Sequence, residues 1–93
     1  NNIVWSNATV CHETVIGDHN FIAANSTIGG GCTIEDLCFL GFSSTILQGI
    51  HIRNETLVGA STLINFNTEK CTKYLGVPGK KTDTHQDIGI QIP

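Results

Sequence analysis

An aliphatic residue recurs at every sixth position along most of this chain. The series comprises Val4, Val10, Ile16, Ile22, Ile28, Ile34, Leu40, Ile46, Ile52, Val58 and Ile64. A strand repeats its side-chain direction every two residues and a helix every 3.6, so a strict period of six belongs to neither alone. A fixed short period is typical of a solenoid, in which each repeat packs only on its neighbours. The pattern therefore predicts an all-β solenoid.

A second ladder, made mostly of small residues, lies two positions before the aliphatic series. Its members are Ala8, Thr14, Asn20, Ser26, Cys32, Cys38, Ser44, Ile50, Thr56 and Thr62. Each hexad then corresponds to a short strand and a tight corner, and three hexads close one triangular coil. Successive coils are expected to pair as parallel strands about 4.8 Å apart. We expect the solenoid domain over residues 1–67 and a C-terminal loop and tail over residues 68–93.

Residues 18 positions apart stack above one another in such a coil, so its corners can be compared as columns. One column is glycine-rich and carries His12 and Glu13, and a second column is also small and nearly uncharged. The third column carries most of the corner charges, including Asp18, Glu35 and Arg53, and we expect it to face solvent. The columns comprise residues 11–13, 29–31, 47–49 and 65–67; 5–7, 23–25, 41–43 and 59–61; and 17–19, 35–37 and 53–55.

One face of the coil carries an apolar ladder on its outer side, made of Ile3, Phe21, Phe39 and Leu57. Monomeric proteins rarely expose a continuous patch of this kind. The chain is also short, so its single core is small and gains from association. We therefore expect the ladder to be a subunit interface. The alternative is that the alternation slips and the phenylalanines turn into the coil.

The composition of the chain narrows the classes of protein to which it can belong. The 93 residues carry a formal net charge of −3, which gives no reason to expect binding to nucleic acid or an anionic membrane. No apolar run approaches 18 residues, and no signal-peptide pattern is present. The chain has no Met and begins within the repeat, so we expect a piece of a longer protein. Four cysteines without a CxxC spacing predict structural thiols in a reducing, cytoplasmic compartment.

The segment after the repeat is basic. Four of the five basic residues, Lys70, Lys73, Lys80 and Lys81, lie near Gly76, Pro78 and Gly79. A basic, glycine-bearing loop at the end of a neutral solenoid suits a phosphate-bearing ligand, or is simply a solvated cap. Beyond it Ile88, Ile90 and Ile92 alternate, as in an extended segment or a disordered terminus.

Together these motifs resemble a known family. The segment from His12 to Asp18, the glycine corner at Gly29 and Gly30, the run from Cys38 to Gly41 and the segment Gly76-Val77-Pro78 occur in the order and spacing of one group. That group is the bacterial sialic acid O-acetyltransferase/nucleotide-sugar N-acetyltransferase family. The resemblance covers residues 3–81. It implies a left-handed parallel β-helix that forms a homotrimer, with acetyl-CoA in the groove between neighbours and a sugar or nucleotide-sugar acceptor.

The resemblance also assigns roles by position. It implies that His12 is the catalytic base, that Glu13 is the acidic residue following it, and that Gly30 lies against acetyl-CoA with Gly29 and Gly49 of its column. It places Gly76, Pro78, Lys80 and Lys81 near the coenzyme, with its phosphates toward the lysines. Two departures stand out: Phe21 replaces a second histidine found in many relatives, and Gly79 replaces a common alanine. Relatives also usually carry an N-terminal nucleotide-sugar-binding subdomain.

The chemistry of a histidine suits this assignment independently. Acetyl transfer from a thioester needs a base that works near neutral pH, and a neighbouring carboxylate raises the basicity of an imidazole. Three rival interpretations remain. The first is a zinc enzyme of the γ-carbonic anhydrase type, but the histidines His12, His19, His51 and His85 form no convergent trio, so we expect no metal. The second is a non-catalytic scaffold, and the third is another hexapeptide acyltransferase of the serine or maltose type.

Overall fold

Each hexad forms a strand of two residues followed by a turn. The fold comes from a computed structural model in which residues 1–84 are described, and it contains strands and turns. The strands are β1 (Ile3–Val4), β2 (Thr9–Val10), β3 (Val15–Ile16), β4 (Phe21–Ile22), β5 (Thr27–Ile28), β6 (Thr33–Ile34), β7 (Phe39–Leu40), β8 (Thr45–Ile46), β9 (His51–Ile52), β10 (Leu57–Val58), β11 (Leu63–Ile64), β12 (Thr72–Leu75) and β13 (Lys80–Thr84). The described residues contain no helix of the length and apolarity needed to cross a membrane.

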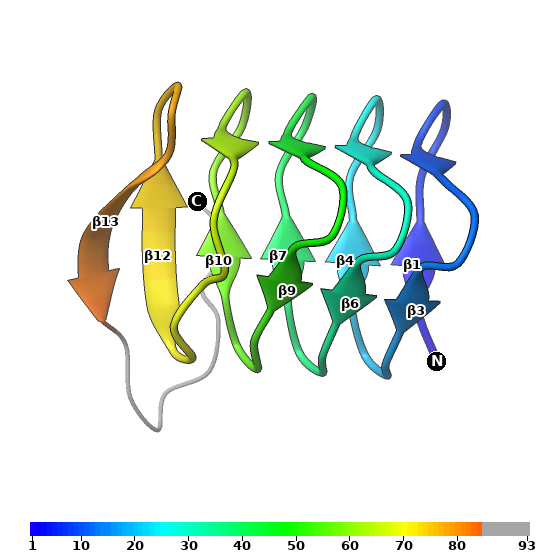
Figure 1. The fold of residues 1–93 in the computed structure, drawn as a ribbon, viewed down its shortest axis with the longest axis horizontal. Helices are drawn as coiled ribbons and strands as arrows, with labels where there is room; N and C mark the ends of the chain where they lie inside the picture. The colour runs from blue at the N-terminus through cyan, green and yellow to red at the C-terminus, as the bar shows by residue number, and fades with distance from the viewer. Residues whose placement is uncertain (85–93) are drawn as a thin grey trace.

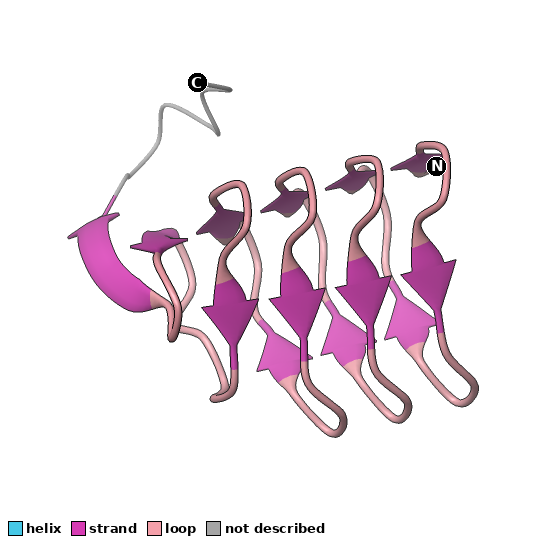
Figure 2. Cartoon of the chain, turned by 90° about the horizontal axis from the view of Figure 1, so that it is seen from above, coloured by secondary structure: helices cyan, strands magenta, loops and turns pink. Residues whose placement is uncertain are grey.

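The strands form three sheets that wrap around one core (Figures 1 and 2). Sheet A has the order β1-β4-β7-β10-β12-β13, sheet B has β11-β8-β5-β2, and sheet C has β3-β6-β9. Pairing is parallel between successive coils, with Ile3 opposite Phe21 and Phe21 opposite Phe39. This register is a shift of 18 residues, as the sequence predicted for three hexads per coil.

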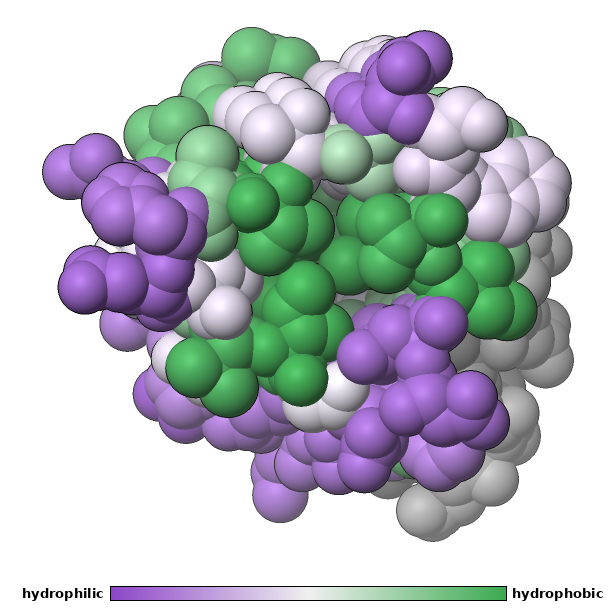
Figure 3. Space-filling view, turned by 90° about the vertical axis from the view of Figure 1, so that its right-hand side faces the viewer, coloured by the Kyte–Doolittle hydropathy of each residue, from purple (hydrophilic) through white to green (hydrophobic). Residues whose placement is uncertain are grey.

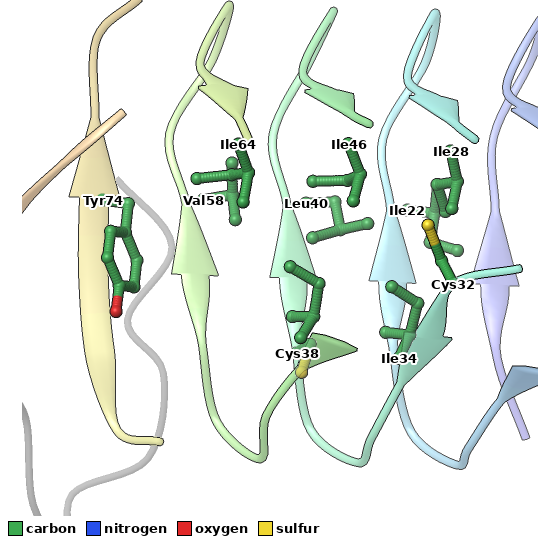
Figure 4. Close-up of a cluster of buried hydrophobic side chains, with 11 residues drawn as sticks. Ile22, Ile28, Cys32, Ile34, Cys38, Leu40, Ile46, Val58, Ile64 and Tyr74 are labelled. Atoms are coloured by element: carbon green, nitrogen blue, oxygen red, sulfur yellow. The ribbon is translucent and has the colours of Figure 1, made fainter. Parts of the chain in front are cut away.

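The aliphatic ladder fills the interior of the coil (Figure 4). Its members from the second coil onward have at most 1% of their surface exposed: Ile22, Ile28, Ile34, Leu40, Ile46, Ile52, Val58 and Ile64. Burying one such side chain stabilises the fold by about 1.5–3 kcal/mol. The repeat therefore places much of the stability of the domain in three interior columns of aliphatic side chains, one from each sheet.

The small ladder is buried as well, and its polar members bond to the backbone of the next coil. The Ser26 hydroxyl donates to the Gly41 carbonyl at 3.0 Å, and the Cys38 thiol donates to the Arg53 carbonyl at 3.1 Å. Burial raises the pKa of the Cys38 thiol to about 12, so it stays protonated at neutral pH. Cys32 is equally buried, whereas Cys11 is exposed and Cys71 is partly buried, so two of the four cysteines occupy the buried positions expected of structural thiols.

The two ends of the solenoid differ. At the N-terminal end the core residues Val4 and Val10 are 49% and 39% exposed, because no coil lies on their outer side. Figure 3 shows this end as an apolar patch bordered by hydrophilic residues. At the other end Tyr74 of β12 continues the core, and its hydroxyl accepts the Glu69 amide at 2.7 Å. The C-terminal segment thus closes one end only.

The structure corrects the expected loop after residue 68. Strand β12 pairs in parallel with β10 and so extends sheet A, and β13 pairs antiparallel with β12. The segment forms a β-hairpin because β10 offers a free edge, and Lys73 and Tyr74 pair there with Leu57 and Val58. The predicted alternation of Ile88, Ile90 and Ile92 lies outside the described residues.

The outer apolar ladder also differs from expectation, since it is not continuously exposed. Phe39 and Leu57 are only 7% and 3% exposed, whereas Ile3 is 54% exposed and Phe21 is half-buried. The rings of Phe21 and Phe39 stack with centroids 5.2 Å apart, and Trp5 packs on Phe21 at 5.5 Å. The side chains therefore lie along the sheet and cover one another rather than projecting outward, and only the N-terminal part of the ladder remains accessible.

On the charged corner, side chains of one coil form hydrogen bonds to the backbone of the preceding coil, so this corner is not simply solvated. The Asp36 carboxylate accepts the Asp18 amide at 2.8 Å, and the Asn54 side chain accepts the Asp36 amide at 2.9 Å. The Glu35 side chain joins two coils. One carboxylate oxygen bonds to the His51 ring, and the other accepts a hydrogen bond from the backbone N–H of Asn54. The bond to His51 is the main cause that lowers the pKa of Glu35 below its ordinary value of 4.5.

Glu35 should therefore stabilise the fold in a pH-dependent way. A carboxyl group whose folded pKa is lowered stabilises fully above its unfolded pKa, and this effect is lost as the pH falls through the folded value. We expect Glu35→Gln to lower the melting temperature by a few degrees at pH 7, and the gap to wild type to close below pH 4.5. Thermal melts across this range measure it, with Glu55→Gln on the same corner as the control. A gap that persists unchanged at acidic pH would contradict the linkage.

Candidate functional site

An open groove of about 850 Å³ follows the corner between sheets B and C. Most of its lining comes from three stacked corners of one column, and the rest comes from two strands of sheet B. The lining residues are Cys11, His12, Glu13, Thr27, Gly29, Gly30, Gly31, Thr45, Ile46, Leu47, Gln48 and Gly49. Apart from His12 and Glu13 the lining is small or uncharged. The groove thus suits an extended, largely neutral molecule.

His12 sits at the corner of the first coil, and its ring lies over the next corner. A Cβ atom placed on Gly30 would be 3.2 Å from Cε1 and 3.3 Å from Nδ1 of His12. Any side chain at position 30 would therefore press on the imidazole. The glycine leaves the space that the His12 ring occupies and keeps the adjoining groove open.

The other positions of the column require or favour glycine for different physical reasons. A Cβ atom on Gly29 would lie 2.7 Å from the backbone nitrogen of Gln48, so only a glycine allows these coils to approach. Gly31 and Gly49 have φ values of +69° and +73°, a conformation that most residues resist, and nothing lies near their missing side chains. Close stacking requires the first glycine, and the turn favours the other two.

Among the described residues, several backbone amides that line the groove have no protein acceptor. Within residues 1–84 the amides of Gly30 and Gln48 donate to no protein acceptor, although the adjacent Gly31 amide bonds to the His12 carbonyl at 3.1 Å. On the charged corner the corresponding amides of Asp18 and Asp36 are bonded by side-chain oxygens of the coil above. The groove therefore combines an accessible imidazole with unpaired N–H donors.

The predicted site residues fall into two groups. The structure brings together His12, Glu13, Gly29, Gly30 and Gly49, all of which line the groove. It does not place Gly76, Pro78, Lys80 and Lys81 in this lining, because they belong to the β12–β13 hairpin.

The hairpin turn nevertheless packs on the end of the sheet that flanks the groove. The Gly79 amide donates to the Leu63 carbonyl of sheet B at 2.6 Å. Lys81 forms an exposed pair with Glu69 at 3.4 Å, a type of contact that contributes little and exchanges readily with another anion. The hairpin lysines thus remain able to meet a ligand that extends along sheet B.

Glu13 lines the groove but does not hold the imidazole. In the part of the chain that the structure describes, no hydrogen bond joins Glu13 to His12, and the His–carboxylate bond present there is that of His51 with Glu35. Glu13 has a φ of +61°, and this turn directs consecutive side chains apart. Any support of His12 by Glu13 is therefore through space.

Sequence reasoning did not single out several residues of the groove. These are Thr27 and Thr45, on two strands of sheet B, and Gln48, in the middle of the corner 47–49. The 18-residue spacing from His12 through Gly30 to Gln48 was the signal that would have identified Gln48. Among residues 1–84, no three His, Cys, Asp or Glu side chains gather as they would around a metal ion.

Comparison with known families identifies the repeat. The model described as bacterial transferase hexapeptide (six repeats) matches residues 1–30, and that described as hexapeptide repeat of succinyl-transferase matches residues 31–65. Together they cover residues 1–65 without a gap. The chain belongs to the bacterial hexapeptide-repeat transferases. This family membership agrees with the predicted fold, a left-handed parallel β-helix with three hexads per coil. A search of curated protein sequences finds no match.

Solved structures of this hexapeptide-repeat fold are similar in shape but distant in sequence. One is AntD, an N-acyltransferase from Bacillus cereus in complex with dTDP-4-amino-4,6-dideoxyglucose and coenzyme A. It superposes with a TM-score of 0.72 at 15% sequence identity, and the match covers 91% of this chain and 64% of AntD. Serine acetyltransferase from Neisseria gonorrhoeae, in complex with serine, gives 0.71 at 20% identity, covering 85% and 39%.

A third structure is GDP-perosamine N-acetyltransferase from Caulobacter crescentus in complex with coenzyme A and GDP-perosamine. It superposes with a TM-score of 0.51 at 18% identity, covering 88% of this chain and 56% of that one. At these identities the similarity shows the fold. The chain spans less than two thirds of the length of each of the three proteins.

The two neighbouring glycines of the groove should respond differently to alanine. Gly29→Ala meets fixed backbone atoms, so we expect a loss of about 1–3 kcal/mol in the free energy of unfolding. Gly30→Ala meets mainly the end of the His12 ring, so we expect a smaller loss and a displaced imidazole. Urea unfolding and the NMR shifts of the His12 ring measure the two effects. Equal stability of both variants, with unchanged His12 shifts, would contradict the packing described above.

Proposed function

We propose that the protein is an acyltransferase that moves the acetyl group of acetyl-CoA to an amino or hydroxyl group of a sugar or nucleotide-sugar. The observation that carries this proposal is the position of His12 over an open groove, beside the unpaired amide of Gly30. Membership of the hexapeptide-repeat transferases supports transfer chemistry. Two structural neighbours hold coenzyme A together with an amino-sugar nucleotide, which supports the substrate class.

In the proposed mechanism His12 acts as the general base. Its neutral imidazole removes the proton from the acceptor amine or hydroxyl as the nucleophile attacks the thioester carbonyl carbon. The carbonyl oxygen becomes negatively charged in the tetrahedral intermediate, and the Gly30 amide stabilises it with a hydrogen bond. Collapse of the intermediate breaks the carbon–sulfur bond, and the imidazolium returns its proton to the departing thiolate. The Gln48 amide is a second donor on the same column.

The coenzyme is proposed to lie along sheet B. Its pantetheine arm would follow Gly29, Gly30 and Gly49 past Thr27 and Thr45, where side chains are small and uncharged. Its phosphates would extend toward the hairpin, near Gly76 and Pro78, to Lys80 and Lys81. The packing of the turn on Leu63 supports this direction, because Leu63 belongs to the same sheet as both threonines.

Removal of the His12 imidazole should abolish turnover without affecting coenzyme binding. We expect His12→Ala to lower kcat by two to four orders of magnitude while the Kd for coenzyme A changes little. Acetyl transfer from acetyl-CoA to dTDP-4-amino-4,6-dideoxyglucose, GDP-perosamine and serine tests the base and the acceptor class together. His19→Asn is the matched control, because His19 is exposed on the charged corner at positive φ, which Asn tolerates. Normal turnover by His12→Ala would overturn the mechanism, and transfer to serine alone would favour a serine-type enzyme.

The phosphate placement predicts a salt-dependent contribution from the hairpin. We expect the double change Lys80→Ala and Lys81→Ala to weaken coenzyme A binding and to reduce its dependence on salt concentration, since screened charge pairs are lost. With dephospho-coenzyme A, which has fewer phosphate charges, the affinities of variant and wild type should differ less. Calorimetric titration at low and moderate salt measures both. Arg53→Gln, on the charged corner, is the control, and equal affinities for all three proteins would refute the placement.

We also propose that the protein assembles as a homotrimer. Ile3, Trp5 and Phe42 are about half exposed, so an apolar strip remains uncovered in the single chain. Sedimentation should show a trimer at micromolar concentration, and Trp5→Glu should shift it toward the monomer. The buried Phe39 is unsuitable for this test, because a charge there would destabilise the chain itself. A wild-type monomer at these concentrations would contradict the assembly.

A further inference from the structure

The coenzyme groove occupies one side of the corner that carries His12. Its lining includes Thr27, Thr45 and Ile46 of sheet B, and it includes no strand residue of sheet C. His12 lies at the corner itself, between these two faces. If the acyl donor lies on the sheet B side, the acceptor has to reach His12 from the sheet C side. This step rests on the proposed function.

The outer face of sheet C presents polar groups one and two coils beyond the His12 corner. The strands β3, β6 and β9 lie side by side in successive coils (Figure 1). Val15, Thr33 and His51 are in register on them, at the ordinary strand spacing of about 4.8 Å. Val15, nearest His12 along the chain, is 64% exposed. Thr33 and His51 are half-buried, so their side chains are accessible yet confined.

His51 and Glu35 form a preorganised pair on this face. The ring Nε2 of His51 bonds to one oxygen of Glu35 at 2.5 Å, and the other oxygen accepts the Asn54 amide at 2.9 Å. Their side chains keep 34% and 30% of their surface exposed. The carboxylate is fixed from two directions, while lone pairs and the second ring nitrogen remain available. Groups held this way bind hydroxyl or ammonium groups with little further loss of side-chain entropy.

We propose that Thr33, His51 and Glu35 form an acceptor-binding subsite on sheet C that recognises the hydroxyl and amino groups of a sugar ring. The threonine hydroxyl donates or accepts, the carboxylate accepts, and the imidazole offers its remaining ring nitrogen. Thr33 and His51 lie opposite each other on adjacent strands, and Glu35 reaches the His51 ring from the corner that follows β6. The His51–Glu35 pair acts by positioning the acceptor, whereas His12 carries the proton transfer.

Binding of D-glucosamine, an amino sugar, to the whole chain tests the subsite. Titration with and without saturating coenzyme A, followed by the NMR shifts of the His51 ring, should show saturable binding in both cases. Thr33→Val and His51→Gln should each weaken that binding about 3- to 10-fold, the loss expected for one hydrogen bond. His51→Gln keeps a donor for Glu35, and thermal melts confirm that each variant is folded at the temperature of the titration.

The controls separate this proposal from the acyl-transfer proposal. His19→Asn, on the charged corner, should bind D-glucosamine as wild type does, and all variants should bind coenzyme A with unchanged Kd. Failure of the wild type to bind coenzyme A, with sugar binding still sensitive to Thr33 and His51, would reject acyl transfer and support the subsite. No saturable sugar binding, or equal affinity in wild type, Thr33→Val and His51→Gln, would overturn the subsite.

Discussion

The structure depends on one constraint, the stacking of every residue on the residue 18 positions away. Parallel pairing at this register places Ile3 beside Phe21 and Phe21 beside Phe39, and the same shift joins strands β1 to β11 in all three sheets. The interior therefore has room for one aliphatic side chain per hexad, and the position two before it has to be small. The core of such a fold tolerates variation only along whole columns, because each interior side chain meets its own equivalents above and below.

The same constraint shapes the candidate site. A corner residue contacts the corners of the next coils, so the environment of His12 is determined by position 30. A glycine there leaves space for the imidazole, and its amide has no protein partner within residues 1–84. On the opposite, charged corner, carboxylate and amide side chains of the coil above take up the equivalent N–H groups. The charged corner and the groove corner thus differ in whether the stacked residue has a side chain that reaches the amide.

The three faces of the prism differ in their chemistry, although their backbone is nearly identical. Sheet A carries stacked aromatic rings and ends in the hairpin that closes the core. Sheet B presents threonines to an open groove, and sheet C presents a histidine–carboxylate pair. Because the outward positions of each strand do not enter the core, they vary without cost to the fold. This freedom is the physical basis for placing a donor and an acceptor on adjacent faces of one small domain.

The period of six by itself determined the solenoid, the buried columns and the grouping of His12 with Gly30, because register follows directly from a strict repeat. Tertiary structure decided what the repeat does not encode. The outer rings of Phe21 and Phe39 lie flat on each other, which depends on side-chain rotation rather than spacing. The hairpin formed because β10 left a free edge for residues beyond the repeat. The His51 ring bonds to Glu35, which is 16 residues away and not at the stacking distance of 18. This contact depends on the directions of the two side chains, which the repeat does not determine.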